Sequence, residues 1–133
     1  MNFNHVTLIV RDFERSKAFY RTLGLTQLVD APPRYARFTL DGDATLSIEV
    51  LPDAPGAPGS SHIFFEVEDV DAKVAELKAH GLPFYQDPTD MHYLWREARL
   101  HDPDGHDLRI YSDATGARLN PPWKLKPETV LSS

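Results

Sequence analysis

Two histidines stand at matching places in the two halves of the chain. His5 and His62 each open a segment in which apolar and polar residues alternate, and 57 positions separate them. The same offset relates three further pairs: Asp12 with Asp69, Ala18 with Ala75, and Gly24 with Gly81. A constant offset across a strand, a helix cap and a helix stop indicates an internal duplication. Imidazoles bind metals, move protons and hydrogen-bond ligands, so the pair is the first candidate for chemistry.

The composition excludes several kinds of chemistry and several kinds of partner. The chain has 133 residues, 41% hydrophobic and 26% charged, which fits one compact domain over residues 1–133. Cysteine is absent, which excludes disulfides, thiolate ligands and a cysteine nucleophile and suits a reducing compartment. The net charge of −6 argues against nucleic acid or an anionic membrane as a partner. No apolar run approaches the roughly 20 residues that span a bilayer. We therefore expect a cytoplasmic protein.

Each half of the chain predicts a strand, a helix and three more strands. Alternation and β-rich runs predict strands over 3–10, 25–29, 35–40 and 45–51, then over 62–68, 84–86, 93–101 and 107–112. Asp12 caps a helix over 13–23 that Gly24 ends, and Asp69 or Asp71 caps a second helix that ends before Gly81.

Two segments lie outside this pattern. Residues 52–61 are rich in proline and glycine and predict a linker. Residues 113–133 contain Asn120-Pro121-Pro122-Trp123, which suits neither a regular helix nor a central strand, so an extended tail is expected there. Trp123 would anchor this tail on its own domain, on a partner subunit or over the mouth of a ligand site.

Several motifs together resemble one family. They are 4–10 (Asn-His-Val-Thr-Leu-Ile-Val), Phe19-Tyr20, 23–25 (Leu-Gly-Leu), 46–50, 61–67, and Asp102-Pro103-Asp104-Gly105-His106 before the last strand. With these motifs in this order, residues 3 to 112 or so resemble the vicinal-oxygen-chelate superfamily of glyoxalase I, extradiol dioxygenases and bleomycin-resistance proteins. The resemblance implies an α+β fold in which two paired β-α-β-β-β modules, 3–51 and 62–112, form curved mixed sheets around a cup. It also implies a homodimer.

Strand alternation then predicts which side chains line the cup, because the opposite parity is apolar. The predicted lining is His5, Thr7, Tyr35, Arg37, Thr39, Ser47, Glu49, His62, Phe64, Glu66, Trp95, Glu97, Arg99, Asp107, Arg109 and Tyr111. From this set the substrate-binding candidates are Arg37, Phe64, Trp95, Arg99, Arg109 and Tyr111. Glu97 is the general-base candidate, and a salt bridge to Arg99 or Arg37 is the alternative. Arg109 would stabilise developing negative charge, so the expected small-molecule ligand is anionic.

The resemblance also implies a metal site with four ligand positions: the two strand-start histidines and a glutamate in the last strand of each module. His5, His62 and Glu49 are assigned to three of them, and Arg109 stands in the fourth, four residues after Gly105. Arginine cannot bind a cation. Two imidazoles and a carboxylate suit iron, zinc, manganese or nickel. The alternative is a metal-free site in which Glu49 and Arg109 form an ion pair.

Two classes of function follow from the resemblance. The first is a metal-dependent lyase, isomerase or dioxygenase that acts on a small oxygen-rich molecule. The second is a metal-free protein that binds or sequesters a small molecule, similar to the bleomycin-resistance proteins.

Overall fold

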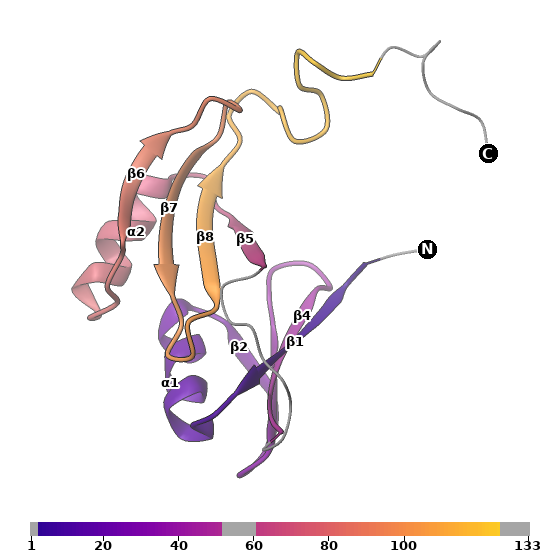
Figure 1. Ribbon diagram of the computed structural model, residues 1–133, viewed down its shortest axis with the longest axis vertical. Coiled ribbons are helices and arrows are strands. Elements are labelled where there is room, and N and C mark those ends of the chain that lie inside the picture. The colour runs from indigo at the N-terminus through magenta and orange to yellow at the C-terminus, as the bar shows by residue number, and fades with distance from the viewer. Residues whose placement is uncertain (1–2, 52–60, 126–133) are drawn as a thin grey trace, which may run out of the picture.

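The computed structural model describes residues 3–51 and 61–125, which form two β-α-β-β-β modules (Figure 1). Module one contains β1 (His5–Val10), α1 (Phe13–Leu23), β2 (Thr26–Ala31), β3 (Tyr35–Thr39) and β4 (Thr45–Val50). Module two contains β5 (His62–Glu66), α2 (Val70–Ala79), β6 (Gln86–Asp90), β7 (Arg96–His101) and β8 (Asp107–Ser112). The predicted linker, apart from residue 61, lies outside the described residues.

Both helices begin and end where the local sequence predicts. The Asp12 carboxylate accepts a hydrogen bond from the Arg15 amide at 3.1 Å, and Asp69 accepts one from the Ala72 amide at 3.0 Å. Each aspartate thereby satisfies an amide that has no partner inside the first helical turn. Gly24 ends α1 with a φ of 113°, a left-handed conformation that costs glycine little.

Each module forms one mixed four-stranded sheet, and the two sheets have the same topology. The strand orders are β1-β4-β3-β2 and β5-β8-β7-β6. The first and last strands of each module pair in parallel, and the remaining pairs are antiparallel. The predicted α+β fold class with two such modules is confirmed. The duplication extends to register, because His5 pairs with Thr45 just as His62 pairs with Asp107.

The sixth strand differs from its prediction. The sequence predicts a strand over 84–86, whereas β6 runs from Gln86 to Asp90, and its pairing with β7 shifts register between Gln86 and Thr89. Gln-Asp-Pro-Thr-Asp has neither alternation nor β-branched character to mark it as a strand. It is an edge strand, where a proline and a bulge are tolerated, and hydrogen bonding to β7 decides its extent.

The apolar faces of both sheets meet in one core. The core draws side chains from α1, β1, β3 and β4 of module one and from α2, β7 and β8 of module two, among them Leu8, Phe19, Tyr20, Phe38, Leu46, Ile48, Leu77, Leu100, Leu108 and Ile110. Because side chains alternate across a strand, the opposite face of each sheet points away from this shared core. We call these outward surfaces the module-one face, which carries His5, Arg37 and Ser47, and the module-two face, which carries His62, Glu97 and Arg109.

The Asp-Pro-Asp-Gly turn between β7 and β8 joins the modules. It lies beside α1 in Figure 1, and the Asp104 carboxylate accepts hydrogen bonds from the Arg11 amide at 2.9 Å and the Ser16 hydroxyl at 3.2 Å. The buried Tyr20 hydroxyl donates to Asp102 at 2.6 Å. This motif therefore has a structural role, because it holds the start of module one's helix against module two.

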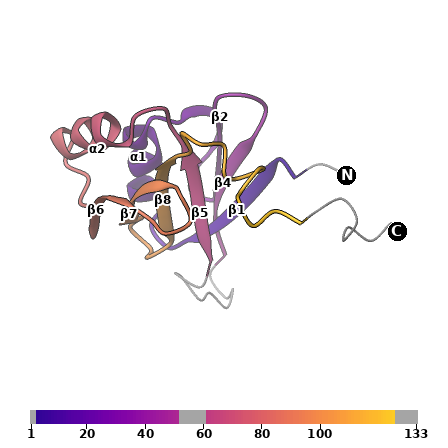
Figure 2. The ribbon, with the colours of Figure 1, turned by 90° about the horizontal axis from the view of Figure 1, so that it is seen from above.

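The described part of the tail consists of turns, and it is not the extended run that the sequence predicts. The Asp113 carboxylate accepts from the amides of Ala117 at 2.7 Å and Arg118 at 2.9 Å, and this local capping folds the chain back. Trp123 is 60% exposed, so it is not anchored on its own domain. In Figure 2 the tail leaves β8 and runs past the end that carries β1 and β4. Within the described residues, no helix has the length and apolar character needed to cross a membrane.

Candidate ligand-binding site

A buried arginine lies at the centre of the module-two face. Strand pairing places Arg109 between Phe64 on β5 and Arg99 on β7. The guanidinium of Arg109 donates to Asp107 at 3.2 Å and to Glu97 at 3.5 Å, and it lies 3.2 Å from the His62 ring. Only 8% of Arg109 is exposed, so its charge is held largely by these neighbours and not by solvent.

Glu97, the general-base candidate, is fully buried at 0% exposure. Its carboxylate accepts a hydrogen bond from the Tyr93 hydroxyl and one from Arg99 Nε at 2.7 Å, besides the contact with Arg109. The salt bridge to Arg99, which the sequence offered as the alternative, is present, while Arg37 lies on the other sheet. Burial, together with the hydrogen bond to Glu97, raises the pKa of Tyr93. Glu97 therefore contacts the guanidinium groups of both Arg99 and Arg109 and helps to position them.

Asp107 is the second carboxylate of this network. It accepts from Arg109 and from the Tyr85 hydroxyl, the latter at 2.9 Å. Burial by itself raises the pKa of Asp107, but the hydrogen bonds from Arg109 and Tyr85 outweigh it and leave the pKa below its ordinary value. The network thus contains two guanidinium groups and two carboxylates and is close to neutral.

Two groups of this network contact the ring of His62. Its Nε2 lies 3.2 Å from a guanidinium nitrogen of Arg109 and 3.4 Å from the Asp107 carboxylate. The side chain of His62 is 46% exposed. An imidazole is therefore accessible beside the buried arginine.

Aromatic rings cover the end of the same face. Trp95 and Tyr111 stack with centroids 4.3 Å apart, and Phe64 meets both edge-on at 5.5 and 5.7 Å. The Arg109 guanidinium lies 5.6 Å from the centroid of the Phe64 ring. Two N–H groups here, Trp95 Nε1 and Arg109 Nε, are buried and have no hydrogen-bond partner within the described residues. Unpaired buried donors are costly and rare in folded proteins.

The module-one face carries a chain of hydroxyl groups that ends at His5. Arg37 Nε donates to the Tyr35 hydroxyl at 2.9 Å, Tyr35 contacts the Ser47 hydroxyl at 2.6 Å, and Ser47 Oγ lies 3.4 Å from His5 Nε2. His5 Nδ1 contacts the Thr45 hydroxyl at 2.6 Å. Both ring nitrogens of His5 therefore have hydroxyl neighbours.

The register of β4 separates Glu49 from His5. On the parallel neighbour, Thr45 is level with His5 and Ser47 with Thr7, whereas Glu49 is level with Ile9. Four residues along a strand span roughly 13 Å. The duplication shows which residues of the two modules are equivalent. In module two, Arg109 pairs with Phe64, which is two residues after His62. In module one, Ser47 pairs with Thr7, which is two residues after His5. Ser47 is thus the counterpart of Arg109, and Glu49 is the counterpart of Tyr111.

These side chains do not fit the family's divalent metal in this chain. A metal of this kind needs its donors within about 2.1 Å of one point. The two positions that should provide carboxylates hold Ser47 and Arg109, and a guanidinium occupies the space beside His62. No group of three or more histidine, aspartate or glutamate side chains in the described part of the chain is arranged to hold a metal. Within the described part of one chain, His5, His62 and Glu49 are not brought together.

The predicted ion pair between Glu49 and Arg109 is also not among the ion pairs of the described residues. Arg109 pairs with Glu97 and Asp107 on its own sheet. The physical reason is the placement of the modules, whose polar faces point away from the shared core. The remaining binding candidates separate in the same way: Phe64, Trp95, Arg99, Arg109 and Tyr111 cluster on module two, and Arg37 is on module one.

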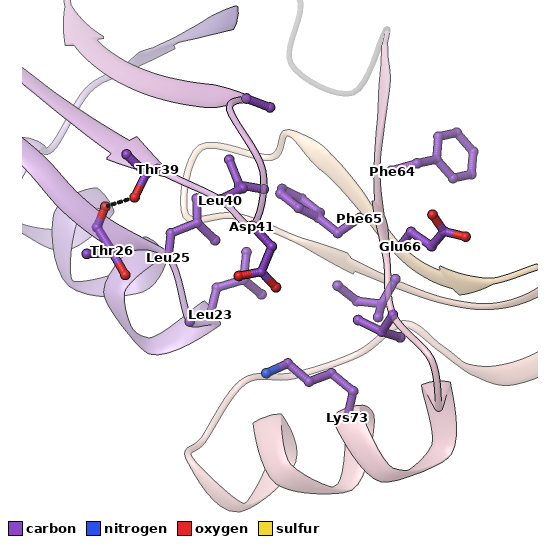
Figure 3. Close-up of a pocket in the computed structure, with 14 residues that line it drawn as sticks. Leu23, Leu25, Thr26, Thr39, Leu40, Asp41, Phe64, Phe65, Glu66 and Lys73 are labelled. Carbon is purple, nitrogen blue, oxygen red and sulfur yellow. Dashed lines mark hydrogen bonds between the residues drawn. The ribbon is translucent and has the colours of Figure 1, made fainter. Parts of the chain in front are cut away.

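A pocket of about 540 Å³, which we call the hollow, lies between the two modules (Figure 3). Leu23, Leu25, Leu40 and Phe65 form apolar walls, and Asp41 and Lys73 lie at its edge. In Figure 3 Phe64 and Phe65 point to opposite sides of β5, so the hollow and the module-two face lie on opposite sides of that strand.

Strand parity placed Asp107 in the predicted lining, but sequence reasoning gave it no role and did not include the hydroxyls of Tyr93 and Tyr85 in the site. Tyr93 and Tyr85 lie outside the regular strands, and only folding of the flanking loops brings their hydroxyls to Glu97 and Asp107.

Comparison with known families identifies the class of protein to which this two-module fold belongs. Residues 2–110 match the Glyoxalase/Bleomycin resistance protein/Dioxygenase superfamily. The chain belongs to this superfamily, as its motifs predict.

Similar proteins cover most of the chain. The uncharacterized protein YaeR of Escherichia coli is 35% identical over 121 residues, which is 81% of this chain and 93% of that protein. The trivalent organoarsenical cleaving enzyme of a Bacillus species is 28% identical and covers 90% of this chain and 78% of its own.

Solved structures show the same fold. A glyoxalase/bleomycin resistance protein/dioxygenase from Nocardioides has a TM-score of 0.76 at 22% identity, covering 95% of this chain and 90% of its own. A lactoylglutathione lyase from Agrobacterium tumefaciens has a TM-score of 0.70 at 22% identity, covering 84% and 92%.

Proposed function

We propose that this protein is a metal-independent member of its superfamily that binds a small anionic molecule on the module-two face. One observation carries the proposal: at the position where the family places a metal-binding carboxylate, this chain buries the guanidinium of Arg109. The counterpart position in module one holds Ser47. A guanidinium that is paired with Glu97 and Asp107 thus stands in place of a metal ligand, and its planar donors suit a carboxylate or enolate oxygen.

The residues of this chain do not match the chemistry that the names of its relatives describe. This sequence contains no cysteine, and thiolates are the soft ligands that trivalent arsenic prefers. Neither carboxylate position of the family's metal site holds a carboxylate. Binding and sequestration need only the side chains that are present: Arg109 and Arg99 for charge, and Phe64, Trp95 and Tyr111 for apolar contact.

We further propose that a second copy of the chain completes the ligand cup. The two polar faces of one chain point away from their common core, so a cup needs a module-one face from another molecule. A cytoplasmic homodimer in which each module-two face meets the partner's module-one face provides two such cups. His5, Ser47 and Arg37 would then line the wall opposite Arg109.

A metal-dependent lyase, isomerase or dioxygenase is the second candidate. It is favoured by the exposed positions of His5 and His62, which are related by the duplication and which a dimer could bring together. In this version His5 and His62 would be metal ligands, whereas Glu49, the predicted third ligand, lies roughly 13 Å along β4 from the position level with His5.

Calorimetric titration separates the two candidates. Metal-stripped wild-type protein is titrated with zinc, iron(II), manganese and nickel, and separately with acetate and benzoate. The proposal predicts no stoichiometric metal binding, and anion binding that Arg109→Gln abolishes while Arg96→Gln, on the opposite side of β7, preserves it. Stoichiometric metal binding that is lost in both His5→Ala and His62→Ala would overturn the proposal in favour of the enzyme.

A further inference from the structure

The two unpaired N–H groups on the module-two face restrict the chemistry of the molecule that binds there. Trp95 Nε1 and Arg109 Nε are buried without partners among the described residues, and Arg109 is more than nine-tenths buried. Both belong to the cluster in which Phe64 contacts Trp95, Tyr111 and the Arg109 guanidinium. Each of these donors lacks an acceptor within the described residues, and both lie beside aromatic surface.

The charge of the network limits the charge of that acceptor. Arg99 and Arg109 are already balanced by Glu97 and Asp107, with contacts of 2.7 to 3.5 Å. Any anion adds negative charge to this balanced site, and a dianion adds twice as much as a monoanion, which is costly at a buried position. Glu66, level with Tyr111 at the end of β5, adds to this repulsion. A singly charged group with flat, two-oxygen geometry therefore has a lower electrostatic cost than a dianion.

The aromatic cluster specifies the rest of the molecule. Phe64 is 38% exposed and presents a ring beside the guanidinium and next to the accessible imidazole of His62. Aromatic rings prefer edge-on or offset contact with other rings, and this preference exceeds what burial of the same area contributes. A flat ring bonded directly to a carboxylate would cover Phe64 while its oxygens face Arg109.

We infer that the ligand is an aromatic or heteroaromatic monocarboxylate, with its ring against Phe64 and the Trp95–Tyr111 stack and its carboxylate on Arg109. This inference rests on the proposed function, because it names the ligand class of the same face. The half-exposed imidazole of His62 adjoins this position and offers a further polar contact to the ligand.

Four probes of similar size test the inference by calorimetry at pH 8: benzoate, cyclohexanecarboxylate, phenyl phosphate and benzyl alcohol. Benzoate is expected to bind about three- to tenfold more tightly than cyclohexanecarboxylate, because only benzoate makes ring–ring contacts. Phenyl phosphate, a dianion at this pH, is expected to bind more weakly than benzoate. Benzyl alcohol, which lacks the charge, is expected to be the weakest of the four.

Three variants assign these preferences to residues. Phe64→Leu should reduce the preference for benzoate over cyclohexanecarboxylate to less than twofold, whereas Arg109→Lys should weaken both acids about tenfold. The matched control Arg96→Lys lies on the same strand but contacts Asp71 and Asp90, and it should keep the full preference. In a Trp123→Phe background, emission of Trp95 should shift on addition of benzoate, because its indole N–H gains an acceptor.

The outcomes distinguish failure of the aromatic-monocarboxylate inference from failure of the proposed anion-binding function. If both carboxylates bind equally well through Arg109, or if phenyl phosphate binds best, the aromatic monocarboxylate is wrong and the anion-binding function stands. If none of the anionic probes binds the folded protein, both proposals fail.

Discussion

Ser47 and Arg109 occupy one position of the duplicated fold. Each lies on the last strand of its module, two residues beyond the partner of the strand-start histidine, and each faces away from the core. Ser47 contacts His5 at 3.4 Å, and Arg109 contacts His62 at 3.2 Å. The duplication has thus kept the histidine and its neighbour in contact in both modules, with a hydroxyl as the neighbour in one and a guanidinium in the other.

Restoring both carboxylates should create a metal site. The variant Ser47→Glu/Arg109→Glu places two glutamates beside the two histidines in the cup of the proposed dimer. Zinc or nickel affinity measured by calorimetry should rise at least about a hundredfold over wild type, since nitrogen and oxygen donors then surround one point. Adding Glu49→Gln should leave that affinity unchanged. A folded double variant with no gain, or a gain that depends on Glu49, would contradict the register equivalence of Ser47 and Arg109.

Removing the guanidinium of Arg109 should destabilise the fold. Arg109→Met leaves Glu97 and Asp107 buried without their shared partner, which should cost about 3 kcal/mol in the free energy of unfolding measured in urea. The matched variant Arg37→Met, on the module-one face, should cost less than about 1 kcal/mol, because Arg37 is only partly buried and, among the described residues, its side chain donates only to Tyr35. Equal losses in the two variants would show that the Arg109 network adds no special stability.

The cysteine-free sequence permits a direct test of how the cup is assembled. Chains with His5→Cys and chains with His62→Cys are mixed, allowed to exchange, and oxidised. A cross-chain cup predicts a covalent dimer, near twice the 15.0 kDa chain mass, that contains one of each chain. Each single variant oxidised alone is the control. Efficient closure of the disulfide inside a monomeric His5→Cys/His62→Cys chain would show instead that one chain forms the cup by itself.

Alkaline pH should weaken the junction between the modules. Burial, together with the charge and hydrogen bond of Asp102, raises the pKa of Tyr20 well above its ordinary value of 10.0. A group whose pKa is raised on folding stabilises the fold below the unfolded pKa, and this stability is lost as pH rises above it. Thermal melts should therefore show a fall in stability above about pH 10 that is smaller in Tyr20→Phe.

At neutral pH the same Tyr20→Phe variant should be less stable by about 1–3 kcal/mol, because Asp102 loses a buried hydrogen bond. The buried rings of Phe19 and Phe38 beside Tyr20 keep their packing, so the loss isolates the hydroxyl. An unchanged alkaline profile in the variant would show that the junction does not depend on this proton.

Local sequence determined the elements and their faces. Asp12, Asp69 and Gly24 set the helix limits through hydrogen bonds and φ angles that involve only neighbouring residues. Alternation correctly separated His5 and Thr7 from Leu8 and Val10, because a strand presents successive residues to opposite sides. The duplication, visible as a constant offset, predicted that both modules share one topology.

Tertiary structure alone decided which polar side chains meet. Ser47 and Glu49 have the same parity, so alternation cannot distinguish them, and only pairing with β1 shows which one adjoins His5. The partners of Arg109 depended on the placement of the modules, since a shared apolar core turns the two polar faces apart and leaves Glu97 and Asp107 as the carboxylates within reach. Both facts come from contacts between segments distant in sequence, which no periodicity within a segment encodes.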